Sequence, residues 1–382
     1  MKTARPSFSG PDGQEDMPYL LTPGPVTTSQ AVKLAMLADF GPRDPEFIAI
    51  TADIRARLLA AAACGPEFEC VLLEGPGTYA IEAMLGSFAP DRRRKTLVVA
   101  NGDQGRQVAA ILERMGRPHV MIDKGDGVAP TVEDLGTMLD SDKLISHVWL
   151  VHCETSSGIV NPLRELAGAA KARGKIVMAD ATSSFGALAI NFSPDGVDAI
   201  AAAPDMCLEG VPGVSFVIAR RTMIEAAAGK SHSVALDLEA QWRALGSNGH
   251  FRFTPPTHTL VAFLEALRAF EAEGGLAARY ARYQKNAIAL AAGMKALGFV
   301  PLIDGAPGPI IQAFLMPADT AFSFVHFSAA LRARGFSISP GTSATPSFRI
   351  GTAGAMDERN IASMLVAVQE VAKAMRIADF AP

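Results

Sequence analysis

The chain has 382 residues, of which 49% are hydrophobic and 19% are charged. This composition excludes a disordered protein, and the length allows a large buried core in more than one lobe. The formal net charge is -4 and the charges are interspersed, so no broad basic surface is available to a nucleic-acid backbone. We therefore predict a globular protein that does not bind nucleic acid.

The four cysteines show no paired spacing and predict neither a zinc ribbon nor a disulfide framework. Residues 1–17 are polar and rich in Gly, Pro, Asp and Glu, which is unlike a signal peptide, and we expect them to form a flexible tail. No apolar run reaches the ~18 residues that a membrane span needs. We expect a cytoplasmic protein that has no contact with a membrane.

Seven short apolar runs alternate with helical patterns in the first two thirds of the chain. They are Phe68–Leu73, Thr96–Ala100, His119–Ile122, His147–Val151, Lys175–Ala179, Asp198–Ala203 and Val214–Ala219. Such alternation is typical of βαβ units, and it predicts a mainly parallel sheet with helices on both faces. Ligands are then expected at the carboxyl ends of the strands.

The composition changes near residue 256, where Ala, Leu, Glu and Arg become frequent. Two long helices are predicted at about 260–273 and 276–297, followed by strand and helix pieces up to Met375. We therefore expect a large domain over residues 18–255, which includes the N-terminal segment, and a smaller α+β domain over residues 256–382.

A glycine-bearing turn, Gly75-Pro76-Gly77-Thr78, ends the first apolar run and opens a helix near Tyr79. Backbone N–H groups at a helix start and the positive end of the helix dipole attract an anion. The turn is therefore either a phosphate cradle or an ordinary strand-to-helix connection, because a short glycine motif is a weak signal.

Asp180 directly follows the fifth run and precedes the small polar residues Ala181-Thr182-Ser183-Ser184. A carboxylate at a strand end can keep a pyridine nitrogen protonated, but it can equally bind a metal or cap a helix. His152, Cys153 and Glu154 do not predict a metal site, because consecutive strand residues alternate between two faces.

Four segments resemble the 2-aminoethylphosphonate:pyruvate aminotransferases, a family of class V aminotransferases with the pyridoxal-phosphate (PLP) fold type I. The segments are His152–Gly158, Asp180–Gly186, Glu209–Gly213 and Arg252–Thr259, and the resemblance extends from Tyr19 to about Met375. It implies an α/β protein with a mainly parallel seven-stranded sheet, PLP at the carboxyl edge of that sheet, and a homodimer. It also implies transfer of an amino group from 2-aminoethylphosphonate to pyruvate, which gives phosphonoacetaldehyde and alanine.

The resemblance also assigns roles to five cofactor-binding positions. Gly77 and Thr78 would hold the cofactor's phosphate, and Asp180 would pair with its ring nitrogen. Thr155 would line the ring pocket, and Thr257 would reach a phosphate across the dimer interface.

A substrate-binding role falls on Arg349, in the run Phe348-Arg349-Ile350-Gly351. By resemblance it would receive the carboxylate or phosphonate of the substrate, because a guanidinium fork fits both acids. A surface arginine on a strand is the alternative interpretation.

The catalytic position departs from the family, because its Schiff-base lysine falls on Met206. A thioether can neither form an imine nor move a proton, so the covalent anchor and the usual general base are both missing. Pro76 and Ala203 stand where the family has serines, and Thr342 stands where it has a lysine.

Three functions agree with this pattern. The first is the aminotransferase reaction of the family. The second is a catalytically silent homologue that binds PLP non-covalently or an aminophosphonate, or that serves as the partner of an active paralogous subunit. The third is a phosphonate lyase-like member, or another enzyme that uses free pyridoxamine phosphate, which is held without a covalent bond. None of the three needs a metal ion.

Overall fold

The computed structural model describes residues 17–91, 93–231, 233–305, 308–342 and 345–382. All but the last residue of the predicted flexible tail, 1–17, lies outside the described residues. Packing divides the chain into two compact units. The large unit comprises Thr28–Glu154 and Ile159–Arg279, and the small unit comprises the chain up to Thr27 together with Thr155–Gly158 and Tyr280–Pro382.

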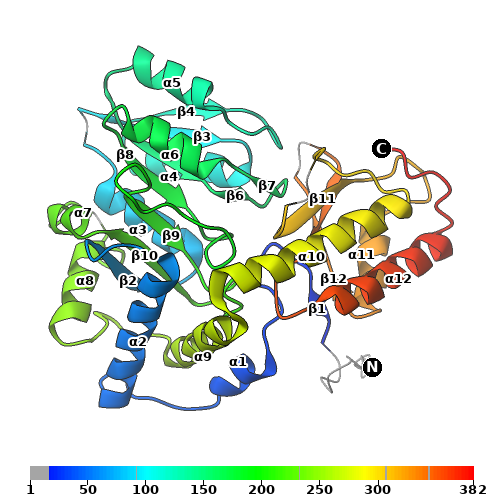
Figure 1. The fold of residues 1–382 in the computed structure, drawn as a ribbon, viewed down its shortest axis with the longest axis horizontal. Coiled ribbons are helices and arrows are strands. Elements are labelled where there is room, and N and C mark those ends of the chain that lie inside the picture. Colours follow the sequence, from blue (N-terminus) through cyan, green and yellow to red (C-terminus); the bar gives the residue numbers. More distant parts are fainter. Residues whose placement is uncertain (1–16, 92, 232, 306–307, 343–344) are drawn as a thin grey trace. The chain divides into compact units, whose positions relative to one another are not determined.

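The large unit is built on a seven-stranded sheet with the strand order β2-β10-β9-β8-β5-β3-β4 (Figure 1). The strands are β2 (Phe68–Glu74), β3 (Lys95–Ala100), β4 (His119–Asp123), β5 (Ile145–Val151), β8 (Ile176–Asp180), β9 (Ala199–Ala202) and β10 (Val214–Arg220). β10 runs antiparallel to both its neighbours, and the other six strands are mutually parallel. Each predicted apolar run is one of these strands, so the predicted fold class is confirmed.

Helices cover both faces of this sheet, which explains why its strands are apolar at consecutive positions. The helices of the large unit are α1 (Gln30–Ala35), α2 (Pro45–Ala62), α3 (Gly77–Phe88), α4 (Asp103–Arg114), α5 (Val132–Ser141), α6 (Leu163–Lys171), α7 (Arg221–Ala226), α8 (Leu238–Ser247) and α9 (Thr257–Glu273). Packing joins α3 to α4 and α5 to α6. The connections through α3 and α4 lead toward the β4 edge of the sheet, and the connections through α5 and α6 lead back toward β8. Because such crossovers are right-handed, the two helix pairs lie on opposite faces of the sheet.

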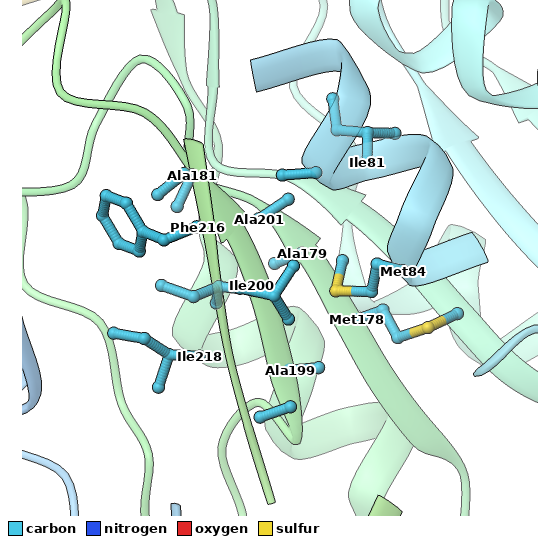
Figure 2. Close-up of a cluster of buried hydrophobic side chains, with 14 of the residues drawn as sticks. Ile81, Met84, Met178, Ala179, Ala181, Ala199, Ile200, Ala201, Phe216 and Ile218 are labelled. Atoms are coloured by element: carbon cyan, nitrogen blue, oxygen red, sulfur yellow. The ribbon is translucent and has the colours of Figure 1, made fainter. Parts of the chain in front are cut away.

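Helix α3 packs against β9 and β10 of the large sheet. Figure 2 shows Ile81 and Met84 of α3 on one side of the central strands, with Phe216 and Ile218 on the other side. All four side chains are buried. A larger side chain on the α3 face would push the helix outward, and the start of α3 would move with it.

The small unit has its own apolar core and two small sheets. One sheet has the order β11-β14-β13, and in the other β1 pairs with β12. The elements are β1 (Tyr19–Leu20), β11 (Ile311–Leu315), β12 (Phe336–Ser337), β13 (Ser339–Pro340), β14 (Ser347–Gly351), α11 (Phe324–Arg332) and α12 (Glu358–Met375). Phe348 of β14 lies among Phe299, Phe314 and Phe327 in the core.

The two predicted long helices are present as α9 and as α10 (Gly275–Ala296). The boundary between the two compact units falls between Arg279 and Tyr280, within α10. Helix α9 belongs to the large unit, where it packs against α1 and α2. The predicted domain boundary after residue 255 stays a prediction. Among the described residues, no helix is long and apolar enough to cross a membrane.

Candidate active site

The start of α3 lies against the segments that follow β8 and β9. A Cβ atom built on Gly77 would be 2.7 Å from Thr182 Cγ2 and 3.4 Å from Ala203 Cβ. The carboxyl ends of β2, β8 and β9 meet at one edge of the sheet because these strands are parallel, so the connections after them come together there. Only glycine fits at position 77 without displacing Thr182.

The first N–H groups of α3 are available for an anion. Gly77 and Thr78 precede the first intrahelical hydrogen bond, and the N-cap residue, Pro76, contributes no side-chain hydrogen bond. Tyr79 N–H donates to the Pro76 carbonyl over 2.8 Å and closes the turn. The geometry is that of a phosphate cradle, although Pro76 removes one N–H that another residue would provide.

Asp180 lies at the carboxyl end of β8 and is only 2% exposed. Its Oδ1 accepts hydrogen bonds from the backbone N–H and the hydroxyl of Thr182, over 2.8 and 2.6 Å. Its Oδ2 accepts from Gln104 Nε2 over 3.3 Å. Burial raises the pKa of Asp180, and the hydrogen bonds from Thr182 and Gln104 oppose that rise. The carboxylate forms no ion pair with a described residue, so it can accept a further hydrogen bond from a cationic N–H donor.

Met206 lies in the loop after β9 and is 4% exposed. Both flanks of this loop are fixed at the site: Ala203 lies beside Gly77, and Cys207 Sγ is 3.1 Å from the Ser183 carbonyl. The Met206 carbonyl accepts from Glu209 N–H over 2.9 Å. The loop that carries Met206 therefore lies between the start of α3 and the segment that follows Asp180.

The described lysines of the large unit are held away from this loop. Lys95, Lys143 and Lys175 lie at the amino ends of strands, and Lys171 binds Asp198 at the start of β9. Lys124 follows β4 and pairs with Asp134, at the far edge of the sheet from β9. The remaining two, Lys33 and Lys230, lie on α1 and after α7. The five lysines beside the strands therefore supply no amine at position 206.

The small unit brings together two other predicted site residues. Arg349 Nη1 donates to the Thr155 carbonyl over 3.1 Å, and Arg349 Nε donates to the Pro340 carbonyl over 2.7 Å. The guanidinium is half-buried and oriented by these two carbonyls. Thr257 is the first residue of α9, in the large unit, and its predicted role across a dimer interface stays a prediction.

Two polar residues at this edge were missed by the sequence analysis. Gln104 contacts Asp180, and the buried Arg279 donates from Nη1 to the Cys207 carbonyl over 2.6 Å. Gln104 follows a strand-end turn, Asn101-Gly102, so the reasoning applied to Gly77 would have indicated it. Arg279 gave no such signal, because it lies within a long helix pattern.

The chain is similar in sequence to known aminotransferases along most of its length. A family model described as aminotransferase class V matches residues 46–349. The chain is 46% identical over 368 residues to the 2-aminoethylphosphonate--pyruvate transaminase of Rhizobium meliloti (strain 1021), covering 96% of each chain. It is 44% identical over 368 residues to 2-aminoethylphosphonate--pyruvate transaminase 1 of Paraburkholderia xenovorans (strain LB400), covering 96% of this chain and 94% of the relative.

Solved structures show the same fold. An aspartate aminotransferase of subgroup IV from Thermus thermophilus has a TM-score of 0.82 at 26% identity, over 94% of this chain and 99% of that one. A pyridoxamine-pyruvate aminotransferase from Mesorhizobium loti has a TM-score of 0.86 at 23% identity, over 94% and 93%. The fold is thus that of the PLP-dependent transferases of fold type I. Within that class, the chain belongs to the class V aminotransferase family, whose cofactor is PLP.

Proposed function

We propose that this protein holds PLP or pyridoxamine phosphate without a covalent bond, and that its substrates are a small aminophosphonate and a keto acid of the pyruvate type. The substrate classes come from its similarity to the 2-aminoethylphosphonate--pyruvate transaminases. The observation that carries the non-covalent part is the buried Met206, which lies between the Gly77 cradle and the segment after Asp180.

The residues present fit the phosphate and the ring of the cofactor. Gly77 and Thr78 offer free N–H groups at a helix start, in a space that a side chain at position 77 would fill. Asp180 offers a buried carboxylate that is not neutralised by a described cation. They do not fit a covalent anchor, because Met206 carries no amine.

Each residue then has a defined task. The bound ring supplies an electron-withdrawing system, and Asp180 serves it by accepting a hydrogen bond from the ring nitrogen. Thr182 keeps Asp180 oriented through its two hydrogen bonds. In the small unit, Arg349 is the proposed receptor for the acid group of the substrate. Position 206 supplies no general acid or base, a loss worth about 10²–10⁴-fold in rate.

This loss favours a second candidate function, that of a catalytically silent homologue. Such a protein would keep cofactor and aminophosphonate binding, or support an active paralogous subunit, without turnover of its own. Formation of alanine from 2-aminoethylphosphonate and pyruvate by the purified protein separates the two candidates. A phosphonate lyase-like activity would instead consume an aminophosphonate without consuming pyruvate or forming alanine.

The test of non-covalent binding combines titration with reduction. Purified protein should bind PLP and pyridoxamine phosphate by absorbance or calorimetry, yet borohydride followed by mass spectrometry should find no pyridoxyl group on any lysine. Met206→Lys is the matched positive control for trapping. A stoichiometric adduct on a lysine of the unchanged protein would contradict the proposal. The proposal would also be contradicted if the protein bound neither PLP nor pyridoxamine phosphate.

We also propose a homodimer in the cytoplasm. Apolar side chains of α1, α2 and α9 line a groove of about 480 Å³ in the large unit, and Leu34 and Leu37 beside it are 53% and 78% exposed. Burying such a surface against a second copy is favourable. Sedimentation should give a dimer that Leu37→Glu weakens, whereas the exposed Leu144→Glu should not. A stable monomer at micromolar concentration would contradict the dimer.

A further inference from the structure

Gln104 contacts two buried acids, Glu154 and Asp180, at the carboxyl edge of the large sheet. It is the second residue of α4, and its backbone N–H donates to Glu154 Oε2 over 3.0 Å. Its side-chain Nε2 lies 3.3 Å from Asp180 Oδ2 and 3.4 Å from Ser183 Oγ. One residue therefore links the segment after β5 to the segment after β8.

The backbone and side-chain hydrogen bonds of Gln104 have different physical roles. Glu154 is fully buried, and its carboxylate at the first turn of α4 satisfies an N–H that has no intrahelical acceptor. This contact fixes the backbone from which the Gln104 side chain extends. The side-chain amide has two N–H hydrogens, and Asp180 and Ser183 each offer it an acceptor oxygen.

The contact with Asp180 is made at the oxygen that matters for a ligand. Oδ1 already accepts two hydrogen bonds from Thr182, whereas Oδ2 accepts only the longer one from Gln104 among the residues that the structure describes. An ionised carboxylate oxygen accepts about two hydrogen bonds, so Oδ2 has one site left. A cationic N–H donor would meet Asp180 at the oxygen whose direction Gln104 controls.

We propose that Gln104 is a positioning residue for Asp180, and that recognition of a protonated ring nitrogen by Asp180 depends on the Gln104 amide. The inference rests on the proposed function, because it assumes that the ligand is a pyridoxal-type cofactor. The amide of Gln104 aligns Oδ2, and it opposes protonation of a carboxyl group that burial would otherwise favour. Without it, Asp180 keeps its place but loses the alignment of one oxygen and part of its ionised character.

The test compares two ligands that differ at one ring atom. Pyridoxamine phosphate and its 1-deaza analogue, in which carbon replaces the ring nitrogen, have the same phosphate and amine. The ratio of their dissociation constants isolates the contact of Asp180 with the ring nitrogen. We expect the unchanged protein to bind pyridoxamine phosphate at least about tenfold more tightly than the analogue, as a charge-assisted hydrogen bond requires.

Gln104→Leu should reduce this ratio to below about threefold, while the affinity for the 1-deaza analogue stays nearly constant. A merely structural loss would weaken both ligands equally and leave the ratio unchanged, which would overturn the inference. Gln107→Leu is the matched control, because Gln107 lies three residues further along α4 and is exposed. Should Gln104→Leu fail to fold, Gln104→Met has similar length without the amide and gives the same test.

Failure of the proposed function gives a different result. If the ratio of dissociation constants is near one in the unchanged protein and does not change in Asp180→Asn, no ring nitrogen is recognised. Both proposals would then be wrong. A ratio that Asp180→Asn abolishes but Gln104→Leu preserves would keep the proposed function and overturn only the role of Gln104.

Discussion

Replacing Met206 by lysine tests whether the missing amine alone separates this protein from an efficient transaminase. Position 206 is 4% exposed, and burial also raises the pKa of the neighbouring Asp205 carboxyl group, so the loop is shielded from water. A fully buried lysine has its pKa lowered by up to about 3–5 units from about 10.4. The new amine should therefore be neutral and reactive near pH 8.

The expected gain is a covalent linkage without efficient turnover. Restoring a general acid and base is worth about 10²–10⁴-fold, but Pro76 still lacks an N–H at the cradle, and a displacement of about 1 Å can cost about 10²-fold. We expect turnover to stay at least about tenfold below the ordinary range of roughly 1–10³ per second. Adding Pro76→Ser and Ala203→Ser should raise it.

The assay follows alanine formation from 2-aminoethylphosphonate and pyruvate, with borohydride trapping measured in parallel across pH. Met206→Leu is the matched control, since it keeps the buried volume without an amine. Turnover of Met206→Lys within the ordinary range would show that the rest of the site is intact and refute this reasoning. Trapping that begins only above about pH 10 would show that position 206 is not shielded from water.

Three further changes test the surroundings of the site. Gly77→Ala should weaken pyridoxamine phosphate binding about tenfold or more in a titration, because its Cβ would lie 2.7 Å from Thr182 Cγ2. Gly86→Ala on the same helix is the control and should not weaken binding, because its Cβ would lie 3.8 Å from the nearest atom, Met115 Cε. Arg279→Leu should lower the free energy of unfolding by about 3–5 kcal/mol in urea, because it removes the partner of two glutamates. Burial lowers the pKa of His152 from 6.5 to about 4, so the unfolded state binds the extra proton first as the pH falls. Stability should then decrease between pH 6.5 and 4 by up to about 3 kcal/mol, and His152→Gln should reduce that slope in urea unfolding.

The sheet could be predicted from the sequence because its strands are buried on both faces. Runs such as Val148–Val151 or Val177–Ala179 are apolar at every position, and that pattern depends little on which strands are neighbours. The order of the strands and the antiparallel direction of β10 could not be predicted in the same way. Both depend on pairings between segments far apart in the chain, such as Val217 with Val71 and Ala201.

The same distinction between local and long-range signals applies to the candidate site. Asp180 and Gly77 could be predicted, because each lies where a strand ends and the local sequence carries the signal. Their mutual arrangement depends on contacts that no short motif encodes, such as the Gly77 contact with Thr182 and the Cys207 contact with Ser183. The buried Arg279 has no local signal, since its acceptor, the Cys207 carbonyl, lies in a loop far earlier in the chain.

These contacts also show which residues hold the loop around position 206 in place. The loop that carries Met206 is held at Cys207 by the Ser183 carbonyl and by Arg279, and neither contact involves the side chain at position 206. Methionine and lysine side chains have similar length, so a change between them at position 206 leaves these two contacts in place. Asp180 is likewise oriented by Thr182 and Gln104 rather than by residue 206. The position of this loop and the orientation of Asp180 therefore depend on residues other than 206.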